Sequence, residues 1–95
     1  MPKNNEPEGV RKLKAHKRLH HLTAGQMSDL LGYTSTDSYF RICRYEYSPD
    51  PDRCAAIAKV IGRSRAWVMD HWASEVAARK RQRAAAIERI AGKAS

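Results

Sequence analysis

The stretch Leu22-Thr23-Ala24-Gly25-Gln26-Met27-Ser28-Asp29-Leu30-Leu31-Gly32 decides the fold. Thr23 and Gln26 are spaced as a capping box, in which the threonine hydroxyl accepts a backbone N–H and the glutamine side chain accepts the N–H of the capping residue. This pair predicts a helix that begins at Ala24.

The predicted helix has one apolar face and a defined end. Met27, Leu30 and Leu31 follow the i, i+3, i+4 spacing of one helix face. Ser28 is small enough for a second helix to approach closely, and Gly32 stands where a left-handed residue would end the helix. The sequence therefore predicts a helix of barely two turns, followed by a tight turn.

Residues 34–46 contain no glycine or proline and predict the next helix. Thr34, Ser35 or Thr36 can serve as its N-cap, and Asp37 suits the positive end of the helix dipole. The expected core side comprises Tyr39, Phe40, Ile42, Cys43, Tyr45 and Tyr47, and the expected outer side comprises Asp37, Arg41, Arg44 and Ser48.

Three further helices are predicted around this pair. The first runs from about Val10 to His20. Another begins with the N-cap Asp50 and Pro51 and stops at Gly62, and the last is capped by Ser64. Beyond about Val76 the apolar stripe of that last helix fails. The sequence contains no convincing run of alternating apolar and polar residues, which would indicate a strand, so we expect an all-α protein.

The charge is concentrated at the two ends of the chain. The 95 residues carry a net charge of +8, with +4 in residues 1–20, −1 in residues 21–62 and +5 in residues 63–95. This length predicts one domain and argues against a two-domain enzyme. We expect no transmembrane segment and no secretory signal, and therefore a cytoplasmic protein.

Catalytic and metal-binding patterns are weak. Cys43 and Cys54 lie in apolar patterns without CxxC spacing, and His16 and His20 lack the companions of a zinc motif. We expect neither metal nor cofactor and no enzymatic activity, since nucleophile–base arrangements and glycine-rich phosphate loops do not stand out.

Three parts of the sequence form one pattern: Leu-Thr-x-x-Gln-Met-Ser-x-Leu-Leu-Gly, then Ile42 with Tyr45-Glu46, and then Ile57-Ala58-Lys59-Val60-Ile61-Gly62. This pattern resembles the Cro/repressor-type (XRE-like) helix-turn-helix family over about residues 10–72. The resemblance implies a five-helix lambda-repressor-like bundle. We expect a flexible leader at 1–9, a DNA-binding domain at 10–74 and a basic C-terminal helical extension or tail at 75–95.

The chain departs from the family pattern in two places. About four extra residues lie between Gly32 and Arg44-Tyr45-Glu46, which predicts either an enlarged turn or an extra turn at the start of the second helix of the pair. The family's usual glycine after the glutamate is replaced by Tyr47-Ser48-Pro49.

The resemblance implies a sequence-specific, DNA-binding transcriptional regulator, a bacterial or phage repressor that binds double-stranded DNA as a homodimer. The candidate base-reading residues are Ser38, Tyr39, Arg41 and Arg44. The candidate phosphate contacts are Lys14, Lys17, Arg18, Thr23, Gln26, Thr34, Ser35, Thr36, Arg79, Lys80, Arg81 and Arg83. The candidate dimer or partner interface is Trp72, Val76, Ile87 and Ile90.

Several alternatives remain open at this stage. Arg41 can pair with Asp37 on a solvated helix face, and the 79–83 cluster can belong to a disordered tail. The aromatic residues of segment 34–46 also suit a protein partner, as in an antitoxin or a small phage factor that binds a host or toxin protein. A third hypothesis is that the protein binds nucleic acid without sequence preference.

Overall fold

The computed structural model describes residues 6–94, with side chains as far as Ala91, and shows five α-helices and no strand in this range. The helices are α1 (Glu8–Leu19), α2 (Ala24–Leu30), α3 (Thr36–Cys43), α4 (Pro51–Ile61) and α5 (Arg65–Ala94). The predicted all-α class is confirmed.

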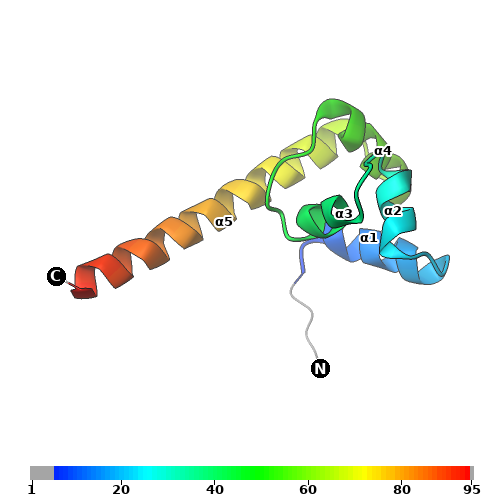
Figure 1. Cartoon of the computed structure of the whole chain (residues 1–95). Coiled ribbons are helices and arrows are strands. Elements are labelled where there is room, and N and C mark those ends of the chain that lie inside the picture. The colour runs from blue at the N-terminus through cyan, green and yellow to red at the C-terminus, as the bar shows by residue number, and fades with distance from the viewer. Residues whose placement is uncertain (1–5, 95) are drawn as a thin grey trace, which may run out of the picture.

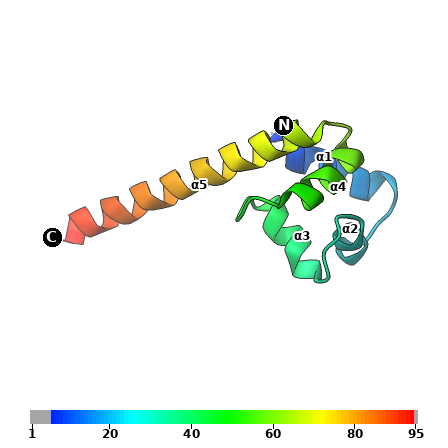
Figure 2. The same cartoon turned by 90° about the horizontal axis from the view of Figure 1, so that it is seen from above.

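Four short helices pack around the first half of a long one. Helix α2 packs against α3, α4 against α5, and α1 against both α4 and α5. The second half of α5 extends away from the bundle as a single rod (Figures 1 and 2). The C-terminal extension is therefore helical and continuous with the bundle.

The predicted starts of α2, α4 and α5 are confirmed by their hydrogen bonds. Thr23 Oγ1 accepts from the N–H of Gln26 at 3.1 Å, and Gln26 Oε1 accepts from the N–H of Thr23 at 2.8 Å. Asp50 caps α4 in front of Pro51. Ser64 caps α5 through the N–H of Trp67 at 3.1 Å.

The core draws on every helix and on the segment after α3. Trp72 is fully buried at its centre, and its indole N–H donates to the carbonyl of Ile42 at 3.2 Å. The other large side chains that are fully buried are Val10, Leu13, Met27, Leu31, Ile42, Tyr45, Ile57 and Val68.

Helix α1 begins before the predicted start. Pro7 precedes it, and Glu8 lies in its first turn, where a carboxylate is favourable. The Arg63 guanidinium bonds to Glu8 at 2.5 and 2.8 Å and, as the largest influence, lowers the pKa of that carboxyl. The predicted leader 1–9 is therefore too long by two residues; residues 1–5 lie outside the described part of the chain.

Gly9 allows the start of α1 to lie directly on α5. A Cβ atom at this position would lie 2.6 Å from two ring carbons of Trp72 and 2.7 Å from Cδ2 of His71. The N–H of Gly9 donates to His71 Nε2 at 3.2 Å, which makes that ring nitrogen an acceptor. His71 is therefore neutral at this junction.

Tyr45 completes the same junction. Its hydroxyl accepts from the N–H of Val10 at 3.2 Å and lies within hydrogen-bond distance of His71 Nε2, at 2.8 Å. The His71 ring also stacks on Trp67, with ring centroids 4.5 Å apart. Burial lowers the pKa of His71.

Helix α3 begins as predicted, with Ser35 as its N-cap, but it ends at Cys43, before the predicted end at Glu46. Five residues, Leu31–Ser35, separate it from α2, so the residues after Gly32 lie in the turn and do not add a helical turn to the start of α3. At its other end Tyr45 takes a left-handed conformation, with φ of 55°, and the N–H of Glu46 returns to the carbonyl of Arg41. The tertiary contacts of Tyr45 hold this conformation, which the helix pattern of residues 34–46 does not reveal.

Two side chains predicted to pack in the core are exposed, Leu30 at 49% and Phe40 at 43%. The apolar side chains of Met69 and Leu19 are exposed as well, at 40% and 72%. Helices this short present only a narrow inner face, because neighbouring positions point about 100° apart.

Candidate nucleic-acid interface

Ser28 joins α2 to the start of α3. Its side chain is 1% exposed, and Ser28 Oγ donates to the carbonyl of Ser35 at 2.8 Å while accepting from the N–H of Tyr39 at 3.2 Å. A single hydroxyl therefore fixes how α3 lies on α2, and it fits only because residue 28 is small.

The outer face of α3 carries exposed arginine. Arg41 pairs with Asp37 at 2.8 Å, as one alternative predicted, and Arg44, just beyond the helix, pairs with Glu46 at 2.5 Å. Both arginine side chains remain more than half exposed. Exposed pairs contribute only about 0–1 kcal/mol, so either guanidinium can exchange its partner for another acceptor.

The other two candidate base-reading residues are less exposed. Tyr39 is 3% exposed and packs in the core, so the prediction that it reads bases is wrong. Ser38 is half-buried. The reason is periodicity, since Tyr39 and Ile42 are three apart on the inner face.

Phe40 is an exposed aromatic residue that the helix pattern of residues 34–46 placed in the core. It lies one turn from Asp37 and Arg44, and this spacing is the signal that could have placed it outside. The exposed face of α3 is therefore part apolar and part charged.

The starts of α2 and α3 lie close together. A Cβ atom on Gly25 would meet Thr36 Oγ1 at 3.2 Å and Thr23 Oγ1 at 3.8 Å. Ser35 caps α3 by accepting from the N–H of Asp37, and its neighbour Thr34 is exposed. The hydroxyls predicted to contact phosphate are therefore gathered at one edge, with Gln26 exposed beside them.

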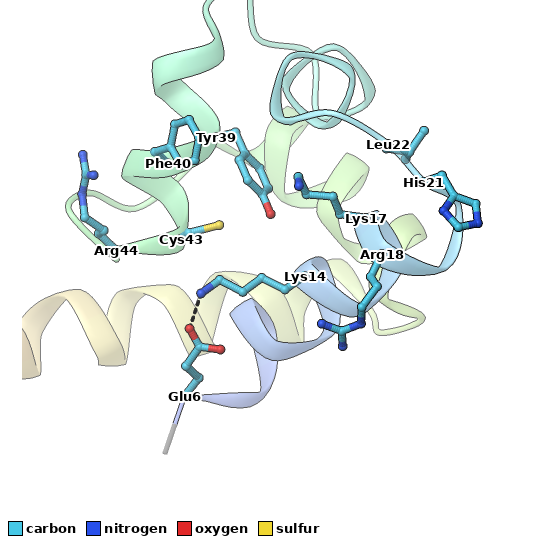
Figure 3. Close-up of a pocket in the computed structure, with 10 residues that line it drawn as sticks. All are labelled: Glu6, Lys14, Lys17, Arg18, His21, Leu22, Tyr39, Phe40, Cys43 and Arg44. Carbon is cyan, nitrogen blue, oxygen red and sulfur yellow. Dashed lines mark hydrogen bonds and ion pairs between the residues drawn. The ribbon is translucent and has the colours of Figure 1, made fainter. Parts of the chain in front are cut away.

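Basic residues of α1 lie across a groove from α3, which we call the α1–α3 groove (Figure 3). Its volume is about 670 Å³. Its basic lining residues are Lys14, Lys17, Arg18 and Arg44, with His21 beside them. These four lysine and arginine residues were predicted separately as DNA contacts, and no sequence pattern indicated that a groove brings them together.

The rest of the groove lining is apolar, apart from one acid. The apolar and aromatic members are Leu22, Tyr39, Phe40 and Cys43, and the acid is Glu6. Burial raises the pKa of the Cys43 thiol, which keeps it protonated and a poor nucleophile.

The basic cluster of α5 divides into an anchored residue and exposed ones. Arg79 bonds to the Glu75 carboxylate at 2.6 Å and lies over the Tyr45 ring at 4.6 Å. Lys80, Arg81 and Arg83 are exposed. Arg79 thus belongs largely to the bundle, whereas the other three remain candidates for phosphate contacts.

The predicted interface residues do not form one surface. Trp72 is fully buried and Val76 is 7% exposed, both in the chain's own core, so their assignment to a partner interface is wrong. Ile87 and Ile90 are 66% and 69% exposed, one turn apart on the extension.

Within residues 6–94, no group of three or more His, Cys, Asp or Glu side chains is arranged to hold a metal ion. The helices in this range are too short or too polar to cross a membrane. No protein-family model matches this chain, and neither do any curated proteins or solved structures.

Proposed function

We propose that this protein is a cytoplasmic, bacterial or phage-borne transcriptional regulator that binds operator DNA as a homodimer and represses by occupancy. The observation that carries the proposal is the α2–α3 pair, in which the Ser28 hydroxyl holds a short helix on the surface with arginine side chains pointing outward.

The dimensions of α3 suit the major groove of DNA. Its eight residues span about 12 Å, and a helix with side chains is about 10–12 Å wide, against a major groove of about 12 Å. Arg41 and Arg44 are the candidates to pair with guanine O6 and N7, a contact that discriminates by about 1–3 kcal/mol. Each would leave its exposed carboxylate partner on binding.

Phosphate contacts would flank this helix. Thr34, Ser35 and Thr36 lie at its start. The basic residues of α1 lie across the α1–α3 groove, and Lys80, Arg81 and Arg83 lie on the extension. If about six phosphates are neutralised, affinity should fall by about three orders of magnitude between 50 and 200 mM salt.

A homodimer would supply the specificity that one helix lacks. An eight-residue helix reads only a few base pairs, so two half-sites about one helical turn apart are the usual solution. Ile87 and Ile90 are the remaining candidates for the contact between two copies, because Trp72 and Val76 are buried in the core of the chain itself.

The deciding experiment is selection from a random duplex library at physiological salt, followed by sequencing of the bound fraction. We expect a two-fold symmetric consensus. Arg41→Ala and Arg44→Ala should each relax the preference at a defined position. The matched control is Arg65→Ala, an exposed arginine at the start of α5, which should leave the consensus unchanged.

Two results would reject the proposal. One is a bound fraction without any enriched sequence. The other is an equal, sequence-blind loss of affinity for Arg41→Ala, Arg44→Ala and substitutions in the 79–83 cluster, which would leave only non-specific binding of polyanions.

A further inference from the structure

The α1–α3 groove combines an apolar floor with a basic rim. Phe40, which is 43% exposed, lines the groove from α3 beside Tyr39, whose hydroxyl points toward α1, and Leu22 lines its far end from the segment after α1 (Figure 3). The volume of about 670 Å³ is enough for one or two large side chains of a ligand. A floor of this kind binds apolar groups, which a phosphate backbone does not offer.

The rim of the groove is strongly positive. Lys14, Lys17 and Arg18 line it from α1, and Arg44 lines it from the end of α3. Glu6 is the acidic residue among the groove's lining residues. The rim therefore has an excess of positive charge, even though Arg44 also pairs with Glu46.

The chain itself shows which chemistry this rim accepts. Glu6, just before α1, pairs its carboxylate with the ammonium group of Lys14 at the groove (Figure 3). A carboxylate on a peptide segment thus lies at one side of the groove, while Phe40 stays exposed to solvent.

From this complementarity we infer that the α1–α3 groove is a docking site for an acidic segment of a partner protein, one that carries an aromatic or large aliphatic residue between carboxylates. The apolar side chain enters against Phe40, and the carboxylates pair with Lys14 and Lys17. Charge complementarity steers such a segment to the groove, and the apolar anchor supplies most of its affinity.

This docking site goes beyond DNA binding and competes with it, a consequence that rests on the proposed function. Lys14 and Lys17 serve both the acidic segment and the DNA contacts proposed above. A partner bound in the groove would therefore release the protein from DNA.

The test is fluorescence polarisation with a short labelled peptide in which glutamates and aspartates flank one phenylalanine and one leucine, measured without DNA. We expect saturable binding to the full chain. Phe40→Ala and Lys17→Glu should each weaken it by about tenfold or more. The matched controls are Met69→Ala and Lys59→Glu, exposed residues outside the groove lining, which should change it by less than about twofold.

Two further variants sharpen the result. Glu6→Gln removes the internal carboxylate from Lys14 and should strengthen binding of the peptide. A peptide in which serine replaces both apolar residues should lose binding, because the rim alone does not hold it at physiological salt.

The inference is overturned if the serine peptide binds as well as the original, or if Phe40→Ala leaves the affinity unchanged. It is also overturned if a random duplex binds through Lys17 while the peptide does not bind at millimolar concentration, since the groove is then a nucleic-acid surface. Because the assay contains no DNA, failure of the peptide leaves the proposed DNA binding standing. Failure of the duplex library to enrich a sequence likewise leaves the peptide site standing.

Discussion

Ser28 shows how one side chain positions the candidate recognition helix. Its hydroxyl bonds both to the carbonyl of Ser35 and to the N–H of Tyr39 while it is almost completely buried. We expect Ser28→Ala to lower the free energy of unfolding by about 1–3 kcal/mol, because these two backbone groups lose their side-chain partner in the interior. Urea denaturation of both proteins measures the difference.

The matched control for this prediction is Ser48→Ala, which removes the same hydroxyl from an exposed position and should change stability by less than about 0.5 kcal/mol. A Ser28→Ala protein as stable as the parent would mean that the α2–α3 contact does not depend on this hydroxyl.

His71 makes the stability of the protein depend on pH. Burial lowers its pKa below 6.5, against opposing effects of the Glu75 and Glu8 carboxylates and with a smaller contribution from Arg79 in the same direction. The unfolded chain therefore binds a proton more readily than the folded one. The stabilisation is complete above about pH 6.5 and is lost as the pH falls through the lower folded value.

We therefore expect the thermal midpoint to fall between about pH 7 and pH 5, and His71→Gln to flatten this dependence. Its matched control is His20→Gln, at the exposed end of α1, which should leave the dependence as it is. The contradicting outcome is a His71→Gln protein whose midpoint varies with pH as steeply as that of the parent.

Residues with local roles could be predicted from the sequence, and residues with tertiary roles could not. The capping pair Thr23 and Gln26 acts within one turn, so its spacing is sufficient evidence. Tyr45 takes its left-handed conformation while bonded to Val10 and His71, which are far away in the sequence. No pattern within residues 34–46 encodes those partners.

The docking of α1 on α5 belongs to the scale of whole elements and depends on Gly9. Helix propensity alone predicts that Gly9→Ala stabilises α1 by about 1 kcal/mol. A Cβ there would lie 2.6 Å from the buried Trp72 ring, so we expect destabilisation of about 1–3 kcal/mol instead. The sign of the change in chemical denaturation decides between the two effects, and a stabilised protein would contradict this docking.

The starts of the helices were predicted better than their ends and their outer faces. Asp50 with Pro51, and Ser64, mark helix starts through chemistry that involves only the next turn. The end of α3 and the exposure of Phe40 depend instead on which neighbouring element covers each face. The sequence therefore indicated basic candidates one by one, but it did not indicate the groove that four of them line.

At the scale of the molecule, the bundle ends near Val76 and the rest of α5 extends beyond it. The failure of the apolar stripe beyond Val76 predicted this division, since a helix without an apolar stripe lacks a surface to bury. The same pattern did not predict that the helix continues to Ala94. It also did not predict that the Arg79 guanidinium lies over the Tyr45 ring.

The division of α5 leads to a prediction for a chain shortened to end at Lys80. This chain keeps Trp72, Val76 and the partners of Arg79, so we expect its thermal midpoint to stay within about 4 °C of the parent. It lacks Arg81 and Arg83 together with the other charges of the rod. Because it also lacks Ile87 and Ile90, the charge effect is tested in the full chain, where Arg81→Ala combined with Arg83→Ala should weaken binding equally for all duplexes and flatten the salt slope by about one for each phosphate that the protein no longer neutralises. Sedimentation equilibrium of the full chain with Ile87→Ser and Ile90→Ser separates this charge effect from self-association, because these substitutions remove the exposed isoleucines and keep the charge.

A shortened chain that unfolds far below the parent would show that the rod stabilises the bundle. An unchanged salt slope would exclude the rod from the DNA interface.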